Sequence, residues 1–432
     1  MAARRGGVYT GHVNLDGLFE YSAVFPFPQG AGSKPCLQGE STDHADGAGT
    51  KPKTGKDRAH PLPVTGGVYL LTDEEDRIIL LASAGNLRRA VQTRLAGPAA
   101  DEDQHPGPAG RRRADLSRIV RRIRWTPACS AFEIGHLYWR LARVLMPRTY
   151  LKQLGFGPAW FVHLDPRAEI PRLAVGKMLR GPPGVDLGPF FTQGDATRFV
   201  QVLQDGFDLC RYEHILEQAP RGTPCAYFEM GRCPAPCSAT IPMSRYRETV
   251  AEALAFSAGD REAMYQVLEV SMREAAARRD YEQAGRIKQR LEQLREIEHR
   301  SFALAAPIDR FNYLVVQRGG GRTRVKPFFV RGGDIAPGET VSLRKLDPAV
   351  GQWLDSWANT TSNGGQADQQ SRSEQTWLVS HFLGRKDPPG LFIRADKIPD
   401  AERLAAMIRE SFSRPEKPAD QGTPTDGGMG EA

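Results

Sequence analysis

The pattern of apolar and polar residues predicts a β-hairpin followed by a helix in the first regular part of the chain. Residues 67–72 and 78–82 are rich in apolar side chains and flank a polar turn, as the strands of a hairpin do. Asn86 then precedes an apolar pattern of helical period that runs to Leu95, and asparagine is a favoured helix N-cap. The elements expected next are a strand over 118–125, a helix over 133–145, strand and turn over 160–190, and a helix over 197–207.

Residues 245–300 carry a clear helical periodicity. Apolar side chains recur at three- and four-residue intervals at Met264, Leu268, Met272 and Ala275, and a second such run follows Asp280. We expect Asp280 to form the turn and to cap the second helix, because its carboxylate accepts hydrogen bonds from free helical N–H groups. The two runs therefore predict an antiparallel helical hairpin.

Beyond the hairpin, the pattern predicts strands over 308–358, with 313–317 and 325–331 the clearest. Residues 359–373 are polar and are expected to form a linker, and a last strand and helix run to about Phe412. The expected fold class is α+β. Its expected parts are an N-terminal extension and disordered linker (1–60), a first domain (61–160), a cysteine module (161–245), a helical region (246–300), a small β-rich C-terminal domain (301–412) and a disordered tail (413–432).

The chain has 432 residues and a formal net charge of +7. It contains no apolar run long enough to span a membrane and no secretory signal pattern, so we expect a cytoplasmic protein. Several arginines cluster near the predicted strand 118–125; such a cluster suits binding to a phosphate backbone, and it also suits a solvated face. The candidate DNA-binding residues are Arg88, Arg111, Arg112, Arg113, Arg121 and Arg122.

Four of the six cysteines lie close together, at Cys210, Cys225, Cys233 and Cys237. In a reducing compartment, clustered cysteines indicate metal binding more often than disulfides. A set of four thiolates suits either a zinc ion or an iron–sulfur cluster. The alternative is four buried free thiols, since cysteine is among the most buried residue types.

The cysteine region resembles that of the bacterial excinuclease C subunit. The similarity lies in Gly188-Pro189-Phe190 and in the segment from Cys225 to Cys233-Pro-Ala-Pro-Cys237. The resemblance implies that the four cysteines hold an iron–sulfur cluster of the 4Fe-4S type, with zinc as the alternative. The gap between the first two cysteines is slightly longer here than in that family.

The predicted helical hairpin resembles the UVR motif of the same family. The residues that carry the similarity are Met272, Ala275, Tyr281, Glu282 and Ala284. The resemblance implies that they bind an excinuclease B-type partner protein. The alternative is an ordinary helical pair that packs on its own domain. Gly285 stands where the family usually has alanine, which predicts a softer helix.

Residues 62–150 resemble the family's GIY-YIG nuclease domain, with Gly67-Val68-Tyr69 as its first half-motif. Metal-dependent phosphodiester cleavage needs a carboxylate that holds the ion and a cation near the developing charge. The resemblance puts the family's catalytic positions on Tyr69, Leu80, Ser83, Ala90 and Tyr138, and only Tyr69 keeps the family's residue. It therefore implies a degenerate domain without catalytic residues, and a role for Mg²⁺ only if a rearranged site works.

The resemblance spans roughly residues 62–345 and implies a protein of nucleotide-excision repair. This protein would bind DNA and an excinuclease B-type partner without cutting, and we do not expect the family's ribonuclease-H-like domain in this chain. One alternative is an active GIY-YIG-type endonuclease that makes a repair incision, which the substitutions disfavour. Another is a UVR-motif stress-response adaptor with a metal site, which would need neither the GIY-YIG frame nor Gly188-Pro189-Phe190.

Overall fold

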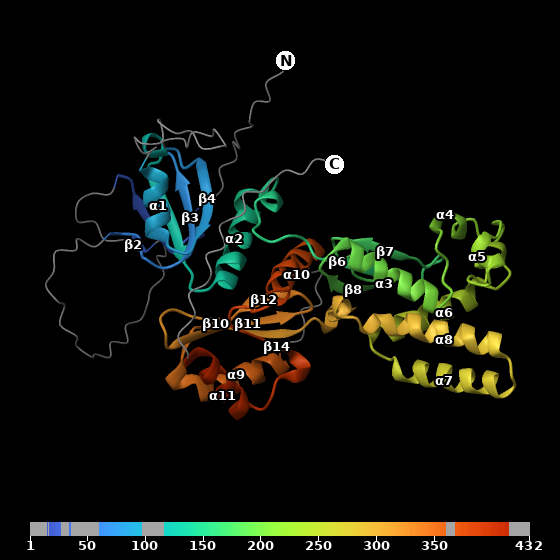
Figure 1. Ribbon diagram of the computed structural model, residues 1–432. Coiled ribbons are helices and arrows are strands. Elements are labelled where there is room, and N and C mark those ends of the chain that lie inside the picture. The colour runs from blue at the N-terminus through green and yellow to red at the C-terminus, as the bar shows by residue number, and fades with distance from the viewer. Residues whose placement is uncertain are drawn as a thin grey trace, which may run out of the picture.

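The computed structural model describes residues 15, 17–26, 34–35, 60–96, 116–359 and 368–413. These residues form three antiparallel sheets with helices packed against them, in agreement with the expected α+β class (Figure 1). Most of the predicted linker before residue 60 and the tail beyond Ser413 lie outside the described residues. None of the helices in the described ranges combines the length and apolarity that crossing a membrane requires.

The first sheet has the strand order β2-β1-β5-β3-β4. Its strands are β1 (Tyr21–Val24), β2 (Lys34–Pro35), β3 (Gly67–Thr72), β4 (Ile78–Ala84) and β5 (Arg122–Pro127). The predicted hairpin is confirmed by β3 and β4, and the predicted helix by α1 (Leu87–Leu95), where Asn86 Oδ1 accepts the N–H of Arg89 at 3.0 Å. The apolar core on one face of this sheet includes α1, and the core on the other face includes α2 (Ala131–Leu145).

Close backbone contact explains why position 67 in the first half-motif is glycine. Strand β3 pairs with β4 on one edge and with β5 on the other. A Cβ atom at Gly67 would collide with the carbonyl oxygen of Thr126 on β5. Only glycine permits this close approach between the two backbones.

The middle sheet has the order β7-β6-β8-β9, built from β6 (Trp160–Leu164), β7 (Leu173–Gly176), β8 (Val185–Phe190) and β9 (Ala306–Pro307). Helix α3 (Gln193–Gly206) packs on it and begins four residues before the predicted start, because Thr192 Oγ1 accepts the N–H of Asp195 at 3.0 Å and caps the helix. The helices that follow are α4 (Glu213–Leu216), α5 (Ala226–Glu229), α6 (Met243–Ala258), α7 (Glu262–Ala277) and α8 (Tyr281–Arg295).

The predicted helical hairpin is confirmed by α7 and α8, which lie side by side at the far end of the molecule from the first sheet (Figure 1). Asp280 caps α8, with its Oδ1 accepting the N–H of Gln283 at 3.0 Å. Leu268 on α7 and Leu291 and Leu294 on α8 are buried in the core that also contains α3.

The C-terminal sheet has the order β12-β11-β10-β14, with β13 paired to β11. Its strands are β10 (Tyr313–Arg318), β11 (Arg324–Arg331), β12 (Asp334–Pro337), β13 (Val341–Ser342) and β14 (Leu391–Arg394). The helices are α9 (Leu346–Asn359), α10 (Gln369–Leu383) and α11 (Ala401–Ser413). Strands β10 and β11 confirm the two clearest predictions of this region.

Two sequence predictions in this region are wrong. Residues 346–358 were expected to be strand, but they lie in helix α9, because Leu346, Val350 and Trp353 recur at helical spacing and are buried in one core with α11. Residues 369–373 were expected to be linker and form the first turns of α10; residues 360–367 lie outside the described residues.

Helix α10 is buried although its sequence is polar, because its hydroxyls bond within the helix. Ser373, Thr376 and Ser380 each donate to the carbonyl four residues earlier, at 2.6, 2.8 and 2.7 Å. A hydroxyl that is satisfied in this way can be buried without the cost of an unpaired donor. These polar residues therefore belong to a buried helix and not to an exposed linker.

The first and third sheets share one continuous apolar core that runs through α2 and α10. It contains Val68 and Leu70 of β3, Phe132 of α2, Phe328 of β11 and Phe382 of α10. The ring centroid of Phe132 lies 5.1 Å from that of Phe328 and 5.3 Å from that of Phe382. The N-terminal and C-terminal thirds of the chain are thus packed together, with α2 between them (Figure 1).

Candidate functional site

The four cysteines come from one module between α3 and α6. Cys210 follows α3, Cys225 stands at the N-cap of α5, and Cys233 and Cys237 lie on either side of the Pro-Ala-Pro turn. Within that turn, Ala235 takes a left-handed backbone conformation with φ 49°. Cys233 and Cys237 are buried, and the other two cysteines are half-buried. The fold therefore gathers all four thiols on one module.

Electrostatic contacts link the four sulfurs. The hydrogen bond between the thiols of Cys210 and Cys233 raises the pKa of Cys210, which burial raises further, and the same bond lowers the pKa of Cys233. Burial and the charge of Cys233 raise the pKa of Cys237, with a smaller contribution from Cys225. The backbone N–H of Cys210 is fixed by the hydroxyl of Tyr246 at 3.1 Å.

The donor chemistry of this module fits a thiophilic metal, since it offers four sulfurs. However, no three His, Cys, Asp or Glu side chains in the described part of the chain already converge at metal-binding distances. The residues that would hold a metal ion or cluster are therefore assigned by their chemistry and proximity. The arrangement of the four cysteines does not distinguish a zinc ion from an iron–sulfur cluster.

Sequence reasoning missed Arg211, which ties the module together. Its guanidinium pairs with Asp205, donates to the carbonyl of Arg232 at 3.1 Å and lies over the ring of Tyr227 at 4.3 Å. The sequence feature that could have indicated this role is the position of Arg211 directly after Cys210. Arg211 fixes α3 against the loop that carries Cys233.

The family's catalytic positions fall on two different faces of the first sheet. Tyr69, Leu80 and Ala90 share the apolar core beneath α1, whereas Tyr138 belongs to the core on the α2 side. Ser83 is exposed. The hydroxyl of Tyr69 interacts with Arg94, and burial raises its pKa. The structure therefore brings together three of the five predicted positions, around one tyrosine and two aliphatic side chains.

The predicted DNA-binding arginines divide into three groups. Arg111, Arg112 and Arg113 lie outside the described residues. Arg88 donates from Nε to the carbonyl of Leu62 at 2.9 Å, and Arg122 shares the carboxylate of Asp76 with the buried Arg124. Arg121 is exposed, with Nη1 donating to the carbonyls of Arg118 and Val120 at 3.1 and 3.0 Å. All three described candidates thus bond within the first domain, and Arg121 is the exposed one among them.

The predicted partner-binding residues lie at the turn end of the hairpin. Tyr281 is 70% exposed, and Glu282 is exposed beside it and pairs with Arg286. Met272 and Ala284 are half-buried, and Ala275 is fully buried between the helices. The hairpin therefore presents an aromatic and an acidic side chain to solvent, while Ala275 serves its internal packing.

Comparison with known proteins gives the same family over most of the chain. The family model described as the UvrC/Cho excinuclease middle domain matches residues 159–256, a range that includes all four clustered cysteines. A UvrABC system protein C from Rhodospirillum rubrum is 27% identical over 308 residues, covering 68% of this chain and 46% of the relative. The protein of that name from Stenotrophomonas maltophilia is 24% identical over 360 residues, covering 83% of this chain and 53% of the relative. The chain is a UvrC-family protein.

This UvrC-family chain spans about half the length of the curated relatives it matches. The relative from Moorella thermoacetica, for example, is 25% identical, and the match covers 43% of its length. No solved structure matches the chain.

Replacing Gly285 by alanine is expected to stabilise the hairpin of this UvrC-family chain by about 1 kcal/mol, because glycine costs about that much in a helix interior. A Cβ atom at Gly285 meets open space. The free energy of unfolding, measured by urea titration, checks this prediction. The control is Gly206→Ala on α3, which should destabilise because its Cβ would collide with Leu294. A destabilised Gly285→Ala variant would contradict the prediction.

Proposed function

We propose that this protein acts in nucleotide-excision repair and binds DNA and an excinuclease B-type partner without cutting DNA itself. The observation that carries the proposal is the match of the middle domain together with the UvrABC system protein C relatives. The non-cutting part rests on the apolar side chains Leu80 and Ala90, which pack with Tyr69 where the resemblance implies catalytic groups. The proposal that the protein binds an excinuclease B-type partner is supported by the exposed turn of the α7–α8 hairpin.

Replacing Tyr281 by alanine is expected to weaken binding to an excinuclease B-type protein by about 2 kcal/mol. Exposed aromatic side chains that become buried at an interface often contribute this much. Tyr281 is 70% exposed, so the fold should tolerate the change. Isothermal titration calorimetry with the partner protein measures the effect.

Val144→Ala, on the outer face of α2, is a matched control because Val144 is an exposed apolar residue away from the hairpin. It should leave the affinity unchanged. Equal affinities for the parent protein and Tyr281→Ala would mean that the hairpin does not provide the contact. A protein that binds no excinuclease B-type partner at all would remove the partner from the proposal.

We further propose that Cys210, Cys225, Cys233 and Cys237 hold a 4Fe-4S cluster. Protein purified without oxygen is expected to be brown and to contain iron and sulfide. Cys233→Ser should lose both and unfold more easily, because metal binding contributes to folding free energy. Cys129→Ser is the matched control, since Cys129 is an exposed thiol outside the module. A colourless protein with one zinc per chain would keep the thiolate site and exclude the cluster.

Two other functions are less well supported. An active repair endonuclease would require a carboxylate near Tyr69, but Glu133 is held elsewhere, with its Oε1 2.7 Å from Lys326 Nζ and its Oε2 accepting the N–H of Cys129. A stress-response adaptor would need only the hairpin and the metal module. It would leave the first domain, whose core continues into the C-terminal sheet, without a role.

A further inference from the structure

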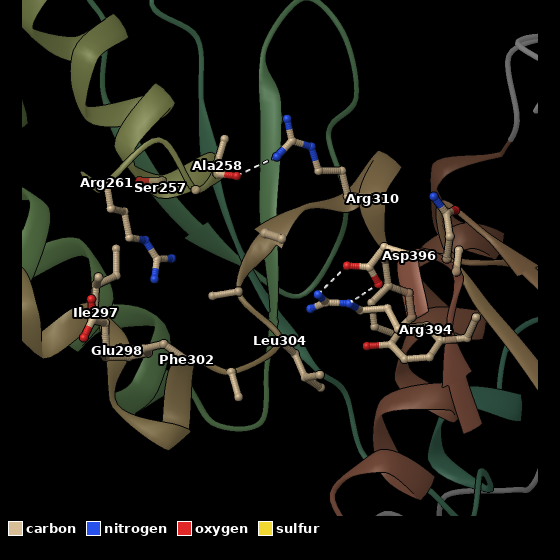
Figure 2. Close-up of a pocket in the computed structure, with 18 of the residues that line it drawn as sticks. Ser257, Ala258, Arg261, Ile297, Glu298, Phe302, Leu304, Arg310, Arg394 and Asp396 are labelled. Carbon is tan, nitrogen blue, oxygen red and sulfur yellow. Dashed lines mark hydrogen bonds and ion pairs between the residues drawn. The ribbon is translucent and has the colours of Figure 1, made fainter. Parts of the chain in front are cut away.

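A pocket of about 620 Å³ lies where the helical region meets the C-terminal sheet. Its walls come from the end of α6, the start of α7, the segment 297–306 after α8, and the strands β10 and β14 (Figure 2). This volume falls within the usual range of small-ligand sites, about 300–1,000 Å³. None of the residues assigned above to the metal, the hairpin contact or the first domain lines the pocket.

Three arginines line the pocket from different elements. Arg261 and Arg394 reach into it from opposite sides, and Arg310 reaches across one end toward Ala258 (Figure 2). The acidic side chains in the lining are Glu298 and Asp396. Three guanidinium groups against two carboxylates leave an excess of positive charge.

The two carboxylates already have partners. Asp396 accepts from Nε and Nη2 of Arg394, at 2.6 and 2.5 Å. Glu298 lies beside the hydroxyl of Tyr265, whose pKa is raised by burial and by the charge of Glu298. Among the described residues, neither acid forms an ion pair with Arg310.

Arg310 has most of its hydrogen-bonding capacity left. Among the described residues, its guanidinium makes one hydrogen bond, from Nη1 to the carbonyl of Ala258 at 2.6 Å. A guanidinium has five N–H donors and binds phosphate oxygens in pairs.

The remaining wall is apolar and partly aromatic. Phe302, Leu304 and Tyr313 line it, and Phe302 and Tyr313 are largely buried. Figure 2 labels Leu304 and Phe302 on the side of the pocket away from Arg310. Donors for an anion at one end and an apolar wall at the other match a ligand with a phosphate and a planar base.

We infer that this pocket binds one nucleotide unit, with its phosphate at Arg310 and its base against Phe302 and Leu304. The unit is either a free nucleotide or part of a nucleic-acid strand. Binding of a nucleic-acid strand rests on the proposed function. Binding of a free nucleotide does not, so the pocket can be tested separately from DNA repair.

The test uses the full chain, with thymidine 5′-monophosphate and a 5′-phosphorylated hexathymidylate as probes in isothermal titration calorimetry. The variant Arg310→Gln should weaken both probes at least about tenfold, because a hydrogen bond to a charged group contributes that much. The variant Leu304→Trp keeps every charge and should abolish binding by filling the pocket. Thymidine without phosphate should bind more weakly than the monophosphate.

Arg245→Gln is the matched control, since it removes an exposed arginine at the start of α6, outside the pocket lining. It should leave both affinities unchanged. Tighter binding of the hexathymidylate than of the monophosphate supports the strand as source, and the reverse supports a free nucleotide. Loss of affinity in Arg245→Gln equal to that in Arg310→Gln would overturn the pocket in favour of general charge attraction. If neither probe binds while duplex DNA binds the parent and both pocket variants equally, the pocket inference fails and the proposed function stands.

Discussion

Replacing Glu374 by alanine is expected to lower the free energy of unfolding by about 3 kcal/mol or more. Glu374 lies on α10 and is fully buried at the junction with α2. Its Oε2 accepts the indole N–H of Trp139 at 2.7 Å, and its Oε1 accepts the hydroxyl of Tyr150 at 2.7 Å and the amide of Gln370 at 2.9 Å. Alanine would leave the buried donors of Trp139 and Tyr150 without this acceptor and would also open a cavity.

Urea denaturation followed by tryptophan fluorescence measures this loss, because Trp139 itself donates to the missing carboxylate. Glu374→Gln should lose less, since its carbonyl oxygen still accepts one of the donors. Glu402→Ala is the control, since Glu402 is exposed on α11, and it should change little. A loss below about 1 kcal/mol in Glu374→Ala would mean that this network does not hold the two ends of the chain together.

The second large effect concerns DNA cleavage, which we expect to stay at background. Removing one electrostatic stabiliser of a transition state costs about a hundredfold or more in rate. In this chain the position that the resemblance gives to a catalytic arginine is Ala90, and Leu80 lies beside it in the same apolar core. Tyr138, at the position of the metal-binding glutamate, belongs to the core on the other face of the sheet and offers only a neutral phenol oxygen.

An incision assay tests this expectation, with supercoiled plasmid and damaged duplex, Mg²⁺ or Mn²⁺, and an excinuclease B-type protein present or absent. Tyr69→Phe should be indistinguishable from the parent protein, because the Tyr69 hydroxyl faces Arg94 in this fold. Metal-dependent nicking that disappears in Tyr69→Phe would instead identify a working, rearranged site. The active-endonuclease function would then replace the non-cutting one.

Local signals in the sequence were sufficient for several elements. Asn86 and Asp280 predicted where α1 and α8 begin, since an N-cap acts through hydrogen bonds to neighbouring backbone N–H groups. The periodicity of Leu268 and Met272 predicted the hairpin from equally local information, because residues three and four apart share one helix face. The cysteine spacing predicted one module, and the fold gathers those thiols there.

Contacts between distant segments could not be predicted in this way. Residues 369–373 at the start of α10 were expected to form a linker, yet the hydroxyls of this helix bond inside it and its other faces pack on α2 and β12. The nucleotide-sized pocket likewise joins Arg261, Arg310 and Arg394, which come from three separate elements. The sequence by itself determined the family, the caps and the helical hairpin, because these depend on residues a few positions apart. Only the tertiary structure decided that α10 is buried, that the N-terminal and C-terminal sheets share one core and that three arginines face one pocket, because burial and charge proximity depend on neighbours tens to hundreds of residues away.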